Sequence, residues 1–145
     1  MSQIIESPIP QGKYLAAVRH TDVIYTSGMT PRKAGKLLYS GEILTNKPIE
    51  SYKEAVHLAA LNCLAAAQSC LKDNEKISLI LQLNIIINAD KEFVNHSKVA
   101  DIASEFLIEK LGVNCIGSRA AIGVASLPSN APIEITLTAK VSKLL

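Results

Sequence analysis

The sequence has little net charge and no long uninterrupted apolar run. Its 145 residues include 15 Lys and Arg against 13 Asp and Glu, a formal net charge of +2. We interpret the one basic group, Arg32, Lys33 and Lys36, as a solvated loop tip, because electrostatic binding of nucleic acid requires a broader patch. The longest nearly apolar run, 77–87, is too short to span a bilayer. The sequence therefore argues against nucleic-acid and membrane partners.

Cysteine is scarce and is not arranged as a metal site. Cys63, Cys70 and Cys115 form no CxxC motif, and no histidine stands near them at ligand spacing. We interpret them as reduced, partly buried cysteines of a cytoplasmic protein. The N-terminus carries Glu6 and no long apolar stretch, so we expect neither a signal peptide nor a transit peptide.

No internal repeat and no linker divides the chain, so we expect residues 1–145 to form a single domain. A chain of this length buries roughly 70% of its unfolded surface, which is enough for a hydrophobic core. The hydrophobic fraction is 48% and the mean hydropathy is +0.22, high for a small domain without a membrane segment. We expect the excess apolar surface to be covered at a subunit interface.

Apolar periodicity and turn residues predict the order strand, strand, helix, strand, helix, strand, strand. The expected strands are 13–20, 23–27, 77–88, 118–125 and 133–141, with a short strand at 36–40. The first expected helix begins near Pro48, with Thr45 or Asn46 as its cap, and the second covers 95–111, with Gly112 as its C-terminal cap. Two helices on one face of a mixed sheet make an α+β layer fold.

The strand at 77–88 is expected to present one face to the helices and the other to a partner. The face toward the helices would comprise Ile77, Leu79, Leu81, Leu83, Ile85 and Ile87. The other face would comprise Ser78, Ile80, Gln82, Asn84, Ile86 and Asn88. This second face is too apolar for open solvent and too polar for a monomer core, which indicates an interface.

The chemically distinctive stretch is 117–140, which reads as two strands joined by a loop. The second strand alternates cleanly, with Ile133 and Ile135 on one face and Glu134 on the other. Arg119 opens the first strand among small neighbours. An arginine can pair with a carboxylate through two parallel hydrogen bonds, which lysine cannot reproduce. We therefore expect the functional site at these two strand ends.

Several motifs, in order and at sensible spacing, resemble the RidA family, also called the YjgF family of reactive-intermediate deaminases. They are 12–18, 23–28, the alanine-rich long helix, the strand from Ile77, 118–124, and Leu127-Pro128 followed by Ile133-Glu134-Ile135. The resemblance covers nearly the whole chain. It is strongest to a longer, uncharacterised subgroup often labelled RidA-like or endoribonuclease L-PSP.

The resemblance implies a chorismate-mutase-like fold of the bacillus type, assembled as a homotrimer with three equivalent clefts between neighbouring subunits. It implies that Arg119 clamps the carboxylate of a small ligand and that Glu134 holds a water. Tyr14 matches the aromatic residue near the cleft, and Ser27 matches the serine after the second strand. Ala121 stands at a substrate-binding position where the family often has cysteine.

Two further positions depart from the family. Met29 stands where glutamine is common, and a family asparagine of the second helix aligns near Ala100 or Asp101. The shape of the pocket and its substrate are therefore expected to differ from those of other members.

The activity that the resemblance implies is hydrolysis of 2-imino acids or their enamine tautomers to 2-keto acids and ammonia. It needs no metal or organic cofactor, because imines already hydrolyse in water and the site has only to position and stabilise charge. Two alternatives stay open: a non-catalytic trimer that binds small carboxylates or a protein partner, and an endoribonuclease. The endoribonuclease alternative lacks a basic surface and a paired general acid and base in this sequence.

Overall fold

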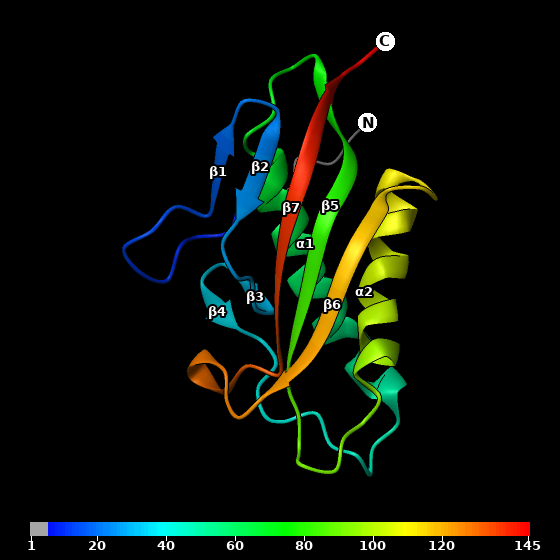
Figure 1. Ribbon diagram of the computed structural model, residues 1–145. Helices are drawn as coiled ribbons and strands as arrows, with labels where there is room; N and C mark the ends of the chain where they lie inside the picture. Colours follow the sequence, from blue (N-terminus) through cyan, green and yellow to red (C-terminus); the bar gives the residue numbers. More distant parts are fainter. Residues whose placement is uncertain (1–5) are drawn as a thin grey trace.

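The computed structural model describes residues 6–145, which form a sheet backed by two helices (Figure 1). The strands are β1 (Ala17–His20), β2 (Val23–Thr26), β3 (Arg32–Lys33), β4 (Lys36–Leu37), β5 (Glu75–Asn88), β6 (Ile116–Val124) and β7 (Ile133–Lys143). The helices are α1 (Lys53–Gln68) and α2 (His96–Leu111), and the 3₁₀ turns are η1 (Ile49–Tyr52) and η2 (Pro128–Asn130). The predicted α+β layer fold, with both helices on one face of a mixed sheet, is confirmed.

The central strand of the molecule is β5. The five-stranded sheet has the order β1-β2-β7-β5-β6, in which β5 pairs parallel with β6 and antiparallel with β7 (Figure 1). The two strands expected in 117–140 are β6 and β7, but they do not pair with each other, since β5 lies between them. The parallel pairing of β5 and β6 uses α2 as its crossover, the usual connection between parallel strands.

Small side chains on α1 let the helix lie close to the sheet. The sequence predicts an apolar stripe on this helix, formed by Tyr52, Val56, Ala59, Cys63, Ala66 and Cys70. Its four central members are fully buried and pack with the apolar face of β7, whereas Tyr52 and Cys70 at its ends are half-buried. The alternation predicted for β7 also holds, because every odd-numbered residue from Ile133 to Val141 is buried. Apolar burial of this kind is the main favourable term in folding.

The alternation predicted for the central strand fails in its first half. Two register shifts interrupt the pairing of β5 with β7, between Ile77 and Leu79 and between Ile80 and Gln82. Ile80 is consequently in the core, with 0% of its surface exposed, while Leu81 is 37% exposed. A bulge reverses which residues face the core, because side chains alternate strictly along a regular strand.

The other face of β5 also differs at its end. Asn88, predicted on the open face, is buried, and its amide Nδ2 donates to the carbonyl of Ala131 at 3.1 Å and to Oδ1 of Asn130 at 3.3 Å. The side chain thus fixes the turn that leads into β7.

The start of the first strand and the cap of the first helix were predicted wrongly. The first strand begins at Ala17 and not at Lys13, because the backbone turns at Gly12, whose carbonyl accepts from the Tyr14 amide. The first helix starts as the 3₁₀ turn η1 after Pro48, with no side-chain cap. The hydroxyl of Thr45 instead donates to Asp90. At the other helix, α2 ends as predicted, with Gly112 at φ 110°.

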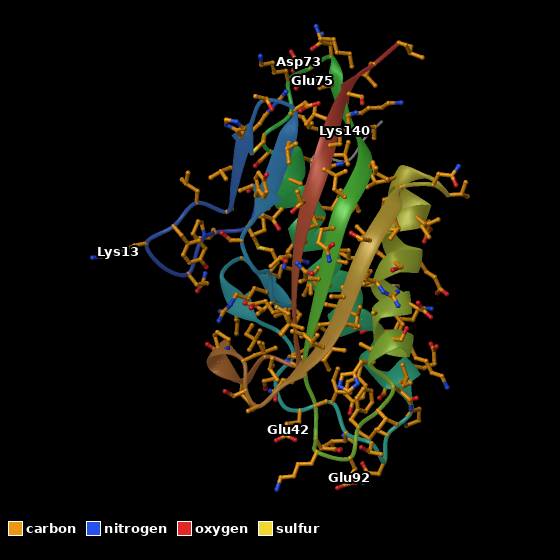
Figure 2. All side chains as sticks on the ribbon, in the orientation of Figure 1. Lys13, Glu42, Asp73, Glu75, Glu92 and Lys140 are labelled. Atoms are coloured by element: carbon orange, nitrogen blue, oxygen red, sulfur yellow. The ribbon has the colours of Figure 1, made fainter. Side chains whose placement is uncertain are left out.

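An ion pair joins three distant segments at one end of the sheet. The guanidinium of Arg19, on β1, donates to both carboxylate oxygens of Glu75 at 2.6 and 2.9 Å and to the carbonyl of Cys70 at 3.1 Å. Glu75 begins β5 and also accepts from the Lys72 amide (Figure 2). These hydrogen bonds, first from Arg19 and then from Lys72, lower the pKa of Glu75 to about 2. The pair fastens β1 to the turn between α1 and β5.

Replacing Glu75 by glutamine is expected to lower the melting temperature at neutral pH. The melting temperature of the variant should also change less than that of wild type as the pH falls. The pKa of Glu75 is depressed on folding from 4.5 to about 2, so its stabilisation is present above about pH 4.5 and is lost as pH falls toward 2. Melting curves from pH 7 to 2 measure this, with Glu42→Gln as the matched control. Equal acid sensitivity in wild type and Glu75→Gln would show that the pair contributes nothing.

Candidate functional site

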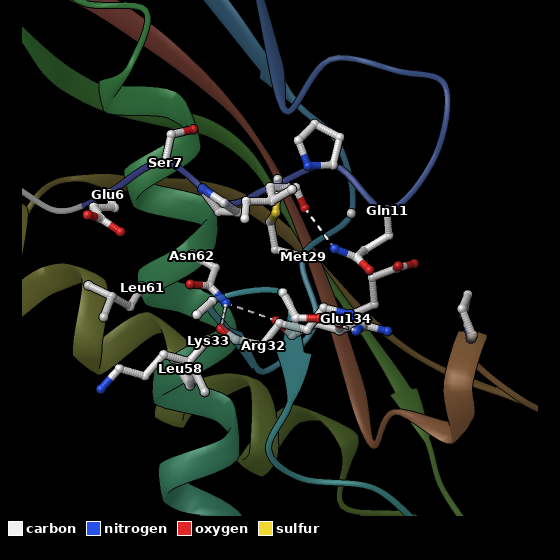
Figure 3. A pocket seen from close by; sticks show the side chains of 18 of the residues that line it. Glu6, Ser7, Gln11, Met29, Arg32, Lys33, Leu58, Leu61, Asn62 and Glu134 are labelled. Carbon is white, nitrogen blue, oxygen red and sulfur yellow. Dashed lines mark hydrogen bonds between the residues drawn. The ribbon is translucent and has the colours of Figure 1, made fainter.

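A pocket of about 570 Å³ opens beside β7. Its walls come from three segments far apart in sequence: the N-terminal residues 6–11, the loop 28–35 that follows β2, and the α1 residues Leu58, Leu61 and Asn62 (Figure 3). Of the predicted site residues, Glu134 and Tyr14 line this pocket. A concave site of this size with a few polar groups is typical of small-molecule binding.

Glu134 is the pocket residue with the most unusual electrostatic environment. It alternates with the buried Ile133 and Ile135, so its side chain leaves the core and enters the pocket. Its carboxylate makes no hydrogen bond or ion pair with the part of the chain that the structure describes, 6–145. Burial raises the pKa of the Glu134 carboxyl above its ordinary value. A partly desolvated carboxylate with free lone pairs can hold a water or accept a proton.

Gly28 makes room for that carboxylate. A Cβ at this position would lie 2.5 Å from Cδ and 2.8 Å from Oε1 of Glu134, closer than carbon and oxygen atoms normally approach. The glycine is held there because the next residue, Met29, bridges to Ile135 on β7. The backbone after β2 therefore forms the wall directly against Glu134.

Tyr14 and Ser27 lie near the same end of β2 but take different roles. The hydroxyl of Tyr14 accepts from the Gln11 amide at 3.1 Å, which closes a tight turn in the pocket wall. The hydroxyl of Ser27 donates to the Leu15 carbonyl at 2.7 Å and does not line the pocket. Ser27 thus orders the segment that carries Tyr14.

Arg119 lies apart from the pocket that Glu134 lines. It stands on the edge strand β6 in register with the buried Leu83, so it faces the helices. Its guanidinium donates to Asp101 Oδ1 at 2.7 Å, to Ser104 Oγ at 3.0 Å and to Ser97 Oγ at 2.9 Å, all on α2. Within one chain the two predicted site residues therefore stand on opposite sides of the sheet.

Ala121 follows Arg119 on the same face of β6, where it is half-buried against the core. It does not line the pocket of Glu134 either.

Sequence reasoning missed Arg32. It belongs to the basic group that we interpreted as a solvated loop tip, yet it is half-buried and lines the pocket together with Lys33. Its Nη1 donates to the Gly35 carbonyl and its Nη2 to Ser129 Oγ, both at 3.1 Å. The only signal of its role in the sequence was its position shortly after Gly28. The sequence could not show that Arg32 lines the pocket, because segments far apart in the chain come together to form the pocket wall.

None of the three cysteines lines the pocket. Cys63 and Cys115 are buried, and burial raises the pKa of the Cys63 thiol to about 12, so it stays protonated near neutral pH. Within 6–145, no three His, Cys, Asp or Glu side chains gather closely enough to hold a metal ion. No described helix is both long and apolar enough to cross a membrane.

We expect Glu134→Gln to raise the melting temperature at neutral pH. The pKa of Glu134 is higher in the folded than in the unfolded protein, so the wild-type protein loses stability as pH rises and the buried carboxyl must ionise. The glutamine of the variant stays neutral, so the variant does not lose this stability. The difference between the two proteins should vanish below about pH 4, where both side chains are neutral. Melting curves across pH, with Glu92→Gln as control, test this; a lower melting temperature for Glu134→Gln at neutral pH would contradict the desolvated environment.

The arrangement matches that of a known family. The family profile described as YjgF/chorismate mutase-like, which also carries an endoribonuclease label, matches residues 6–141. Protein TCP17 of Trypanosoma cruzi is 26% identical over 128 residues, which cover 87% of this chain and 79% of the relative.

Solved structures agree with this match. Atu1372 of Agrobacterium tumefaciens is 30% identical with a TM-score of 0.82, and the likeness covers 92% of this chain and 86% of that one. E. coli TdcF, solved with bound serine, is 16% identical with a TM-score of 0.67 over 96% and 95% of the two chains, a likeness of fold alone. The chain therefore belongs to the YjgF/chorismate mutase-like family, also known as the RidA family, as its motifs predicted.

Proposed function

We propose that the protein hydrolyses 2-imino acids or their enamine tautomers to 2-keto acids and ammonia. The observation that carries this proposal is Glu134, a carboxylate with a raised pKa and no described protein partner, in the wall of a pocket. Such a group can hold the attacking water in place and take its proton. The E. coli relative TdcF was solved with bound serine, a small amino acid, which supports a ligand of related chemistry.

The proposed reaction adds water to one carbon and then removes ammonia from it, so the protein has to support only the proton transfers. The water oxygen bonds to the imine carbon while its proton passes to Glu134, and the electron pair of the C=N bond moves to nitrogen, which takes up a proton. When this carbinolamine collapses, the C=O bond forms and the C–N bond breaks. The hydroxyl proton passes to the nitrogen, which leaves as ammonia. A base whose pKa is raised toward neutral pH performs both transfers better than an ordinary carboxylate.

Arg119 is proposed to clamp the substrate carboxylate from a second copy of the chain, in a homotrimer. Within one chain, Arg119 lies on the helix side of the edge strand β6, away from the pocket of Glu134. The exposed position of β6 at the sheet edge suits it to face a cleft between copies. Bidentate pairing would fix the orientation of the imine carbon relative to the water on Glu134.

The open face of the sheet supports the proposed assembly. Side-chain hydrogen bonds run across it from Ser118 to Gln82, from Gln82 to Asn84 at 2.9 Å and from Asn84 to Thr136 at 3.0 Å. Around this polar row lie exposed apolar side chains, of which Ile122 is 51% exposed. A polar row within an apolar surround is suited to burial against a partner, because the Gln82 and Asn84 amide nitrogens each already donate one hydrogen bond.

A second candidate is a non-catalytic protein that binds small carboxylates. It is favoured by the engagement of Arg119, whose terminal nitrogens already donate to Ser97, Asp101 and Ser104. A substrate carboxylate would have to displace at least one of these acceptors. An endoribonuclease activity has no comparable support among the described residues, since the pocket offers no paired general acid and base for RNA cleavage.

Arg119→Ala is expected to lower the hydrolysis of an imine, generated in the assay by an amino-acid oxidase, by about tenfold to a hundredfold, the usual loss for a charge-assisted hydrogen bond. Release of 2-keto acid is followed against the buffer rate. Lys98→Ala, which removes an exposed cation of α2, is the matched control. If wild type only equals the buffer rate with several imines, the deaminase proposal is excluded and the binding alternative is left.

Asp101→Asn separates a binding role of Arg119 from a structural one. The variant removes the negative charge that competes with a substrate carboxylate for the guanidinium. A clamp should then bind its substrate more tightly and show a lower KM, whereas a purely structural pair should show only a lower melting temperature.

Ile122→Glu is expected to dissociate the proposed trimer, because a charge on the open face would be buried without a partner. Light scattering of wild type and variant measures the mass. Val113→Glu is the control, since Val113 is 80% exposed in the loop between α2 and β6. A monomeric wild-type protein, or a trimer that tolerates Ile122→Glu, would contradict the proposed interface.

A further inference from the structure

The pocket beside Glu134 is larger than the imine of a small amino acid requires. Its volume of about 570 Å³ falls within the range of about 300–1,000 Å³ found for sites that enclose drug-sized ligands. The extra space extends from Glu134 toward α1, where Leu58 and Leu61 form the far wall (Figure 3). Both leucines are half-buried.

Apolar side chains dominate this extension. Leu58 and Leu61 come from α1, Met29 from the loop after β2, and Pro8 and Ile9 from the N-terminal segment. Covering such surfaces with an apolar ligand removes them from water, which favours binding. The extension is therefore suited to a hydrocarbon body.

A fixed cation stands in the same pocket. Asn62 donates through Nδ2 to the carbonyls of Thr30 at 3.0 Å and Arg32 at 2.7 Å, which ties the loop backbone to α1. The guanidinium of Arg32 is positioned by Gly35 and Ser129. Among residues 6–145, no carboxylate lies within ion-pairing distance of Arg32.

Arg32 retains donors for a ligand. A guanidinium has five N–H groups, and the carbonyl of Gly35 and the hydroxyl of Ser129 take one each. Its planar fork matches the two oxygens of a carboxylate, and the existing hydrogen bonds reduce the entropy lost on binding.

We infer that one chain forms a complete binding site for an amphipathic carboxylate, with the anionic group on Arg32 and the hydrocarbon body along Leu58 and Leu61. This inference uses the pocket of the proposed function but goes beyond it, since binding requires neither Arg119 nor hydrolysis. It also specifies a ligand bulkier than the imines of serine or threonine.

Calorimetric titration with hexanoate, acetate and hexan-1-ol tests both halves of the site in the full-length protein. Hexanoate is expected to bind more tightly than acetate, because acetate lacks the hydrocarbon body. It is expected to bind at least about tenfold more tightly than hexan-1-ol, which lacks the charge. Equal affinity for hexanoate and hexan-1-ol, equal affinity for hexanoate and acetate, or no binding of hexanoate would each overturn the inference.

Single substitutions test which side chains form the charged half and the apolar half of the site. Arg32→Gln should reduce hexanoate affinity to that of hexan-1-ol, while Arg32→Lys, which keeps the charge, should retain part of it. Lys36→Gln removes an exposed cation from β4 outside the pocket and should change nothing. Leu61→Ser should remove the advantage of hexanoate over acetate. If Arg32→Gln and Lys36→Gln bind hexanoate alike, or Arg32→Lys loses as much as Arg32→Gln, Arg32 only fastens the loop.

Failure here and failure of the proposed function are distinguishable. Arg119→Ala should leave hexanoate binding unchanged, whereas it should suppress imine hydrolysis. Arg32-dependent hexanoate binding by a protein that hydrolyses no imine would retain this inference and exclude the deaminase. Imine hydrolysis without Arg32-dependent binding of hexanoate would retain the deaminase proposal and exclude this inference.

Discussion

The site depends on a two-residue bridge between the loop after β2 and strand β7. Met29 and Ile135 exchange both backbone hydrogen bonds, at 2.8 and 2.9 Å. This places Gly28 against the Glu134 carboxylate, so closely that a side chain at position 28 would force the Glu134 side chain to move. Because the bridge belongs to the same antiparallel arrangement as the sheet, the packing of the core also fixes the position of the pocket wall. Desolvation of Glu134, and with it the raised pKa, follows from that close approach.

Three arginines serve different parts of the molecule. Arg19 is committed to Glu75, a bidentate pair that fastens the sheet to the end of α1. Arg32 is held by neutral oxygen acceptors and keeps its charge available within the pocket. Arg119 is intermediate, since Asp101 neutralises it but two of its contacts are serine hydroxyls that a ligand could replace. The nature of the acceptor, anionic or neutral, thus separates structural arginines from those open to a ligand.

The proposed deaminase and the proposed carboxylate site share one pocket but use it differently. Hydrolysis requires a water on Glu134 and an imine carbon oriented by Arg119 of a second copy. Binding along Leu58 and Leu61 requires only one chain and the charge of Arg32. A bulky substrate could use both, with its hydrocarbon body in the extension toward α1. This combination would account for a family member in which Met29 replaces a more polar side chain in the pocket wall.

The sequence alone determined the family, the order of elements and the faces of α1 and β7, because these follow from local periodicity and from motifs in fixed order. It also indicated Glu134 and Tyr14, which line the pocket. It could not place β5 between β6 and β7, or the bulges that turn Ile80 into the core, since register is decided by pairing between distant segments. Only the tertiary structure brought Arg32 into the wall of the pocket that Glu134 lines and directed Arg119 toward α2, because packing between distant segments decides what a side chain contacts.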